Sequence, residues 1–221
     1  MKASIHVLPA PRAPHQRLHC DALAHGLLRH GVDVVEGRWN EPATACDLAI
    51  VWGWKQPALT AAVIARGGHV LMLERGYVQP RMDWASLAVD GLEGAGRFLP
   101  APDGGARWDR HFGHHLRPWR RNFELPHLLL GQVPGDAALA GLDFDAWAAA
   151  VVRRLHGDGH VVLWRAHPVA VQRGRARVPP NSIEIDGTLD AALDMAGAVV
   201  THSSMAAVEA VLAGVPAIAL G

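Results

Sequence analysis

Short apolar runs alternate with amphipathic stretches along most of the chain. In the first half, this pattern predicts strands at 3–8, 32–35, 48–52 and 69–73, and helices at 15–30 and 56–66. Gly31 follows the first helical stretch, as is typical of a helix C-terminus, and Pro57 stands where a helix begins. Strands that alternate with helices predict a mostly parallel sheet covered on both faces.

The same alternation returns after residue 126. It predicts strands at 127–131, 160–165, 182–185, 198–201 and 217–220, and helices at 143–156, 188–196 and 203–213. Between 74 and 122 the pattern stops, and Gly, Pro, Arg, His and Trp become frequent; irregular segments of this length usually serve a function. We therefore predict an α/β fold with two Rossmann-like domains, 1–124 with an irregular insertion at 74–122, and 125–221.

Composition narrows the class of protein. Half of the 221 residues are hydrophobic and 19% are charged, which excludes general disorder. Basic and acidic residues balance at 21 each, so no net charge draws the chain to nucleic acid or membranes. Cys20 and Cys46 are too few for a disulfide framework. With no membrane-spanning apolar run and no signal-peptide pattern, we expect a cytoplasmic protein without stable membrane insertion.

Polar side chains follow the strands of the second half, where the ligands of open α/β sheets bind. A strand-to-helix junction offers free N–H groups, a helix dipole and hydroxyls, which together suit an anion. Ser203 could be only a helix cap and Glu209 only a solvated residue, but their combination with the others favours a binding site. The candidates are Arg165 and His167 after one strand, His202, Ser203 and Ser204 after another, and Glu209 in the next helix.

The motif RAHP, a short helix and the string VVTHSSMAAVEAVLAGVPAIALG resemble the nucleotide-binding domain of GT-B glycosyltransferases. The likeness covers about residues 127–221 and is nearest to capsular-polysaccharide transferases and bacterial sialyltransferases, which carry an HP and a paired Ser/Thr motif. It implies a GT-B-like arrangement and a nucleotide-sugar donor. His167, Ser203 and Ser204 would bind the donor phosphates, and Glu209 would bind the ribose. Arg165 would compensate the charge of the departing nucleotide. The implied donor-binding residues are Arg165, His167, Thr188, His202, Ser203, Ser204 and Glu209. Since GT-B chains usually continue into a C-terminal helix, the end at Gly221 suggests a minimal version or a missing end.

Transfer with inversion needs a carboxylate that accepts the proton of the acceptor hydroxyl. Glu74, at the end of a predicted strand, is the first choice for this catalytic base, and Asp90 in an Asp-Gly turn is the second. An ion pair of Glu74 with Arg75 or Arg81 explains Glu74 equally well. The string ERGY…R…S…DG from residue 74 to 91 also resembles bacteriophage-encoded transferases.

Cationic and aromatic side chains alternate between residues 107 and 121, a pattern that suits a polyanion or an unstacked base. A solvated loop explains the pattern equally well. His111, His114 and His115 lack the further ligands that a metal site needs, and GT-B enzymes usually hold their donors without a catalytic metal. The candidate acceptor-binding residues are Arg75, Arg81, Arg117, Trp119, Arg120 and Arg121.

Together these features predict a metal-independent glycosyltransferase with no cofactor besides the nucleotide-sugar co-substrate. The first choice of acceptor is a hydroxymethyl pyrimidine in phage-type DNA, which suits the phage-like string and the arginine–aromatic segment. A capsular or other surface glycan is the alternative, and the lack of net positive charge counts against DNA. A non-catalytic nucleotide-binding module is a second alternative.

Overall fold

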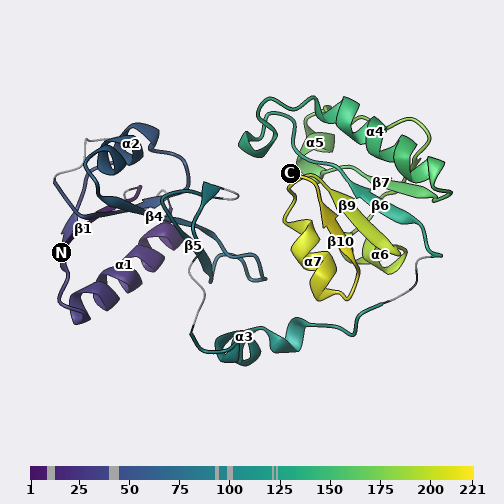
Figure 1. Cartoon of the computed structure of the whole chain (residues 1–221). Coiled ribbons are helices and arrows are strands. Elements are labelled where there is room, and N and C mark those ends of the chain that lie inside the picture. Colours follow the sequence, from purple (N-terminus) through teal and green to yellow (C-terminus); the bar gives the residue numbers. More distant parts are fainter. Residues whose placement is uncertain (9–12, 40–44, 93–94, 99–101, 121, 123) are drawn as a thin grey trace. The chain divides into compact units, whose positions relative to one another are not determined.

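The computed structural model describes every residue except 9–12, 40–44, 93–94, 99–101, 121 and 123. The chain forms two compact units, residues 1–105 (unit 1) and 106–221 (unit 2). Each is built on one sheet, which has five strands in the described part of the chain (Figure 1). The predicted α/β class with two Rossmann-like sheets is confirmed, while the division falls after Gly105 rather than after residue 124.

The sheet of unit 1 has the strand order β2-β1-β3-β4-β5. Helix α1 packs on one face of this sheet against Ile50 and Trp52, and α2 packs on the other face against Val51 and Met72. Central strands buried on both faces are uninterrupted apolar runs, and for this reason they could be read from the sequence. The elements are β1 (Lys2–His6), α1 (Pro14–Arg29), β2 (Asp33–Glu36), β3 (Leu48–Trp52), α2 (Pro57–Ala65), β4 (His69–Arg75) and β5 (Ala85–Val89).

The first part of the insertion at 74–122 is regular, contrary to expectation. Strand β4 continues to Arg75, and β5 pairs with it in the antiparallel direction, with Glu74 opposite Ser86. Further along lie a short helix, α3 (Ala106–His111), and a 3₁₀ turn (Gly113–His115). Strand β5 was missed because its hydrogen-bond partners are supplied by β4, which the local pattern of a five-residue segment does not reveal.

The sheet of unit 2 has the order β10-β9-β6-β7-β8 with all strands parallel. Helix α4 covers one face, and α6 and α7 cover the other. Asp143 and Thr188, the first residues of two predicted helices, are N-caps that accept hydrogen bonds from backbone N–H groups in the first turns of α4 and α6. The elements are β6 (His127–Leu130), α4 (Phe144–Gly157), β7 (Val162–Arg165), α5 (Pro168–Gln172), β8 (Ile183–Glu184), α6 (Leu189–Asp194), β9 (Ala198–Thr201), α7 (Ala206–Leu212) and β10 (Ala217–Ala219), with a 3₁₀ turn at Ala137–Leu139.

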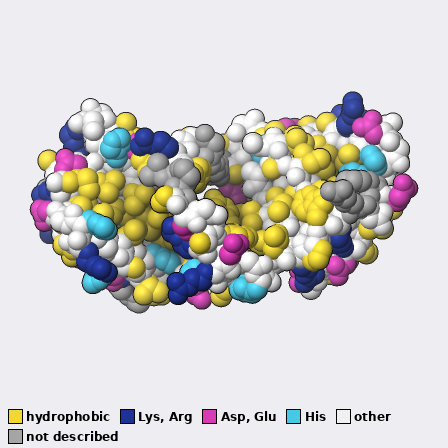
Figure 2. Space-filling model, turned by 60° about the horizontal axis from the view of Figure 1, so that its bottom comes forward, with side chains coloured by type: hydrophobic (Ala, Val, Ile, Leu, Met, Phe, Trp, Pro, Cys, Tyr) yellow, Lys and Arg dark blue, Asp and Glu magenta, His cyan; other side chains and the backbone are white. Residues whose placement is uncertain are grey.

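Charged side chains are mixed over the molecular face drawn in Figure 2. Lys and Arg side chains lie among acidic and hydrophobic ones there and do not gather into one broad basic surface. This mixture agrees with the equal numbers of basic and acidic residues. No helix in the described ranges is both long and apolar enough to span a bilayer.

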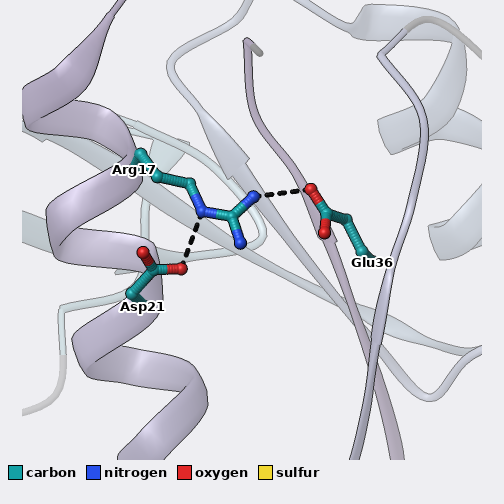
Figure 3. A network of polar contacts seen from close by, with 3 residues as sticks. All are labelled: Arg17, Asp21 and Glu36. Carbon is teal, nitrogen blue, oxygen red and sulfur yellow. Dashed lines mark hydrogen bonds and ion pairs between the residues drawn. The ribbon is translucent and has the colours of Figure 1, made fainter. Parts of the chain in front are cut away.

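Arg17 connects α1 to β2 through two carboxylates (Figure 3). Its Nε donates to Asp21 over 2.8 Å, and one of its terminal nitrogens donates to Glu36 at the end of β2 over 2.5 Å. The three side chains are at least 41% exposed, so each pair contributes about 1 kcal/mol or less. The buried face of α1, which includes Cys20, therefore holds the helix on the sheet more strongly than this network does.

The residues before β6 join unit 2 because they are bonded to its helices. The N–H of Arg117 donates to the carbonyl oxygen of Leu212 over 2.8 Å, and the N–H of Arg120 donates to that of Gly214 over 2.7 Å. Gly214 has a φ of +75°, and a Cβ at this position would overlap the carbonyl oxygen of Pro118. Only glycine therefore allows both the turn after α7 and this close approach.

We predict that Gly214→Ala destabilises unit 2 by more than about 1–2 kcal/mol, because a left-handed backbone and a backbone clash act together. Gly157→Ala is the matched control, since Gly157 ends α4 with no atom within 4 Å of an added Cβ. Urea unfolding followed by tryptophan fluorescence measures both variants. Equal stability of the two would contradict the packing described for residues 117–120.

Candidate functional site

The strand order of unit 2 places the carboxyl ends of β6 and β9 side by side. From β6 the chain builds β7 and β8 on one side of the sheet, and then crosses to build β9 and β10 on the other side. Open α/β sheets bind ligands at such a reversal, beyond the carboxyl ends of the two strands. The residues at this point are Gln132, which follows β6, and Ser203, which follows β9.

Gln132 and Ser203 hold each other through two hydrogen bonds. The N–H of Ser203 donates to Oε1 of Gln132 over 3.0 Å, and Nε2 of Gln132 donates to Oγ of Ser203 over 3.0 Å. Gln132 is buried, and Ser203 is exposed. Since Oγ of Ser203 already accepts a hydrogen bond, its own proton is free to donate to a ligand.

Ser204 has a similar arrangement. Its N–H donates to Oγ1 of Thr201 over 3.3 Å, and its Oγ accepts from the N–H of Ala206 over 3.2 Å. Helix α7 begins at Ala206, so the expected helix start at Ser203 is wrong. The N–H groups of Ser203, Ser204 and Ala206 are bound to side-chain oxygens that lie nearer than any ligand would. Hydroxyl protons, rather than these N–H groups, are therefore the donors of this junction.

His167 lies at the start of α5, after β7, which is the strand on the other side of β6 from β9. Its Nδ1 accepts from the N–H of Val169 over 3.1 Å, so the neutral ring carries its proton on Nε2 and donates from there. Burial lowers the pKa of His167, and the charge of Arg165 lowers it further, against the opposite effect of Asp136. A Cβ at Gly131 would lie 3.0 Å from the His167 nitrogen, so the residue before Gln132 touches the His167 backbone.

The other predicted donor residues have more varied surroundings. Arg165 ends β7 and donates to the carbonyl oxygen of Gly187 over 3.0 Å, while its Nε is buried without a partner in the described part of the chain. Thr188 caps α6, which is a structural role. The ring of His202 stands edge-on to Trp147 at 5.5 Å. Glu209 lies half-buried on α7.

Glu74 occupies the carboxyl edge of the sheet in unit 1. Its carboxylate covers Gly53, where an added Cβ would overlap Oε1, and Gly53 has a φ of +58°. The N–H of Gly53 donates to the carbonyl oxygen of Leu73 over 2.8 Å, which holds the turn after β3 against β4. A half-buried carboxylate at the end of a central strand is well placed to meet a substrate.

Asp90 lies at the opposite edge of the same sheet, so the structure does not bring it together with Glu74. Its carboxylate accepts from the N–H of Val70 and from Nδ1 of His69, each over 2.8 Å, at the amino end of β4. Burial acts to raise the pKa of Asp90, but the bonds from Val70 and His69 and the charge of Arg97 outweigh it and lower the pKa. These bonds give Asp90 a structural role at this edge, and its role as an alternative base stays a prediction.

Two of the predicted acceptor-binding arginines have structural partners. Nε of Arg81 donates to the carbonyl oxygen of Gly76 over 3.1 Å, and Arg120 donates to that of Leu193, at the end of α6, over 2.7 Å. Both guanidinium groups hold turns of the chain, and the expected role of these two residues in acceptor binding stays a prediction. Of the other candidates, Arg75, Arg117 and Trp119 are exposed, and Arg121 lies outside the described residues.

Gln132 was missed in the sequence. The only signal was its position directly after the apolar run of β6, since a single glutamine carries no recognisable motif. Within the ranges described, no group of three or more His, Cys, Asp or Glu side chains is arranged to hold a metal ion.

The sequence matches no protein-family profile and no curated protein. Two solved structures from Thermosulfurimonas dismutans are similar over almost the whole chain. The KpsC beta Kdo 2,7 transferase matches with a TM-score of 0.62 and 15% identity, covering 100% of this chain and 79% of its own. The KpsC beta Kdo 2,4 transferase matches with a TM-score of 0.55 and 17% identity, covering 98% and 79%. At such identities the likeness shows the fold alone, an α/β fold with two mostly parallel sheets.

We predict that His167→Asn keeps the cap of α5, because asparagine is a good N-cap, but removes a group with a lowered pKa. His167 has a pKa of 6.5 in the unfolded chain and a lower pKa in the folded protein, so the unfolded chain binds a proton first as the pH falls. The contribution of His167 to the free energy of unfolding is therefore complete above pH 6.5 and is lost as the pH falls through the pKa of the folded state. The stability of the variant relative to wild type should therefore improve from pH ~7.5 to pH ~5.5, as measured by urea unfolding. An unchanged difference would contradict the neutral, capping state of His167.

Proposed function

We propose that this protein is a glycosyltransferase that moves a sugar from a nucleotide-activated donor to a hydroxyl group of a saccharide acceptor. The observation that carries the proposal is the set of outward donors at the reversal of strand order in unit 2. Gln132 fixes Ser203, Ser204 holds the start of α7, and His167 has Nε2–H available at the end of β7, the other neighbour of β6. The GT-B-type fold supports the same conclusion.

These donors suit the phosphate groups of a nucleotide. The bond from the sugar to the phosphate oxygen breaks during transfer, and its electron pair leaves with the nucleotide. Hydrogen bonds from the two hydroxyls and from His167 would stabilise this charge, and Arg165 would add a nearby positive charge. Donors already held by the protein need little reorganisation when the charge develops.

Glu74 is the proposed base. It would accept the proton of the acceptor hydroxyl while the hydroxyl oxygen forms the new bond to the sugar. The position of Glu74 at the carboxyl edge of unit 1, over the glycine turn at Gly53, supports this role. Asp90, the second candidate for the base, lies at the other edge of the sheet.

A saccharide is favoured over DNA as the acceptor. The two similar structures are named Kdo transferases, and neither name refers to nucleic acid. In the arginine–aromatic segment, Arg120 holds α6 and is not available to phosphates. The equal numbers of basic and acidic residues also provide no net positive charge for binding DNA. We therefore propose a capsular or other surface glycan in place of a hydroxymethyl pyrimidine.

We predict that at least one member of a panel of nucleotide sugars raises the melting temperature, and that Gln132→Glu abolishes the effect. The new carboxylate would accept a hydrogen bond from the Ser203 hydroxyl and would repel phosphate. The affinity for the nucleotide sugar should therefore fall about tenfold or more. Gln172→Glu makes the same charge change at an exposed position of α5 and should retain binding. Thermal shift and calorimetric titration measure both.

Full binding by Gln132→Glu would refute the donor site. Binding without transfer to any saccharide or to water would favour the non-catalytic nucleotide-binding module instead.

We further predict that Glu74→Gln lowers the transfer rate by about 10²–10⁴-fold, because the amide keeps the shape but cannot accept a proton. Donor affinity should remain, since Glu74 belongs to unit 1. Asp90→Asn is the control: it should lower stability and leave the rate of the folded protein near wild type. A larger rate loss for Asp90→Asn than for Glu74→Gln would overturn these roles.

A further inference from the structure

Two histidines of α1 lie against the end of β3 in unit 1. The His15 ring stands edge-on to Trp52 with 5.2 Å between centroids, and the His19 ring is stacked on Trp52 at 6.0 Å. Trp52 is the last residue of β3 and is almost fully buried. The two rings therefore line the carboxyl edge of the sheet, which is also the edge that carries Glu74.

Two cationic side chains reach the same edge from neighbouring strands. Lys55 follows β3 by three residues, and Arg75 ends β4; the strands are in register with Trp52 opposite Leu73. Both side chains are exposed, and neither forms an ion pair or side-chain hydrogen bond with another described residue. Other described arginines of unit 1, such as Arg17, Arg81 and Arg97, have carboxylate or carbonyl partners.

The edge also contains an unused polar atom. Nε2 of His15 is buried and has no hydrogen-bond partner within the described residues. Burial lowers the pKa of His15, and the charges that lower it further are those of Arg75, His19 and Lys55. These four side chains form one cluster at the carboxyl edge, in which Nε2 of His15 has no partner among the described residues.

Aromatic surface accompanies this charge. Trp54, next to Lys55, is 48% exposed, and Tyr77, two residues after Arg75, is 42% exposed. Such amphipathic rings present flat apolar faces, which suit the apolar faces of sugar rings better than a small inorganic anion.

We propose that the basic cluster of His15, His19, Lys55 and Arg75 binds an anionic sugar of the acceptor saccharide. This inference rests on the proposed transferase function and names the chemical class of its acceptor. The carboxylate or phosphate group of the sugar would receive hydrogen bonds from Lys55, Arg75 and Nε2 of His15. The sugar hydroxyls would then lie at the edge that carries Glu74. Of the cluster, only Arg75 was expected from the sequence to contact the acceptor.

The test compares three probes: a glucuronate-terminated tetrasaccharide, its carboxyl-reduced neutral counterpart, and inorganic phosphate. Calorimetry and the ring resonances of His15 and His19 in NMR spectra follow binding to the full chain. The acidic tetrasaccharide should bind at least about tenfold more tightly than the neutral one, since charge-assisted hydrogen bonds are lost on reduction. Inorganic phosphate should displace the acidic tetrasaccharide if the anionic group alone accounts for binding. If phosphate does not displace it, the site is specific for acidic sugars.

The variant Lys55→Ala/Arg75→Ala should lose the preference for the acidic probe. The control Arg29→Ala/Arg153→Ala removes two exposed arginines elsewhere and should retain it. Equal binding of the acidic and neutral probes, or an unchanged preference in the Lys55→Ala/Arg75→Ala variant, would overturn the proposal. The proposed function can fail separately from this proposal. Binding of the acidic probe without any sugar transfer would support the basic cluster and refute the transferase function. Sugar transfer without a preference for the acidic probe would support the transferase function and refute the basic cluster.

Discussion

The proposed donor site depends on one buried amide, that of Gln132. Gln132 uses its oxygen and its nitrogen on the same serine, and so joins the loop after β6 to the loop after β9. The two loops lead away in opposite directions along the sheet, because the strand order reverses between β6 and β9. Beyond the ends of the two strands, the side chain of Gln132 joins the loops. A buried amide with both ends satisfied is rigid, and its loss would leave unpaired polar groups. The free hydroxyl proton of Ser203 is a direct consequence.

Unit 1 uses a glutamine at its own reversal of strand order. Nε2 of the buried Gln56, after β3, donates to the carbonyl oxygen of His6, at the end of β1, over 2.9 Å. Nδ1 of His6 in turn donates to the carbonyl oxygen of Arg38, which leaves Nε2 to accept from Ser4. The two reversals are thus closed by the same chemistry, but their edges differ. Unit 2 presents mainly neutral donors, and unit 1 presents unpaired cations beside a carboxylate.

This difference fits the two substrates of a transferase. Neutral hydroxyl and imidazole donors bind a phosphate without the strong charge pairing that would slow release of the nucleotide product. The acceptor must instead be oriented so that one hydroxyl meets a base, and directional cationic contacts can supply this orientation. The hydroxyl donor of Ser203 in unit 2 is held in place by hydrogen bonds, whereas Lys55 and Arg75 in unit 1 have no side-chain partners among the described residues.

Local sequence determined the central strands, the caps Asp143 and Thr188, and the glycines that end helices, because these features depend on apolar runs and on backbone geometry. It also placed His167, Ser203 and Glu74 at strand ends, which the parallel topology turns into edges. Tertiary structure alone decided the rest. Strand β5 needs β4 as its partner, Asp90 and Arg120 are committed to distant backbone groups, and the partner of Ser203 lies 71 positions away in the chain. Hydrogen bonds between such distant positions leave no periodic trace in the sequence, and they decide which polar side chains remain free for a ligand.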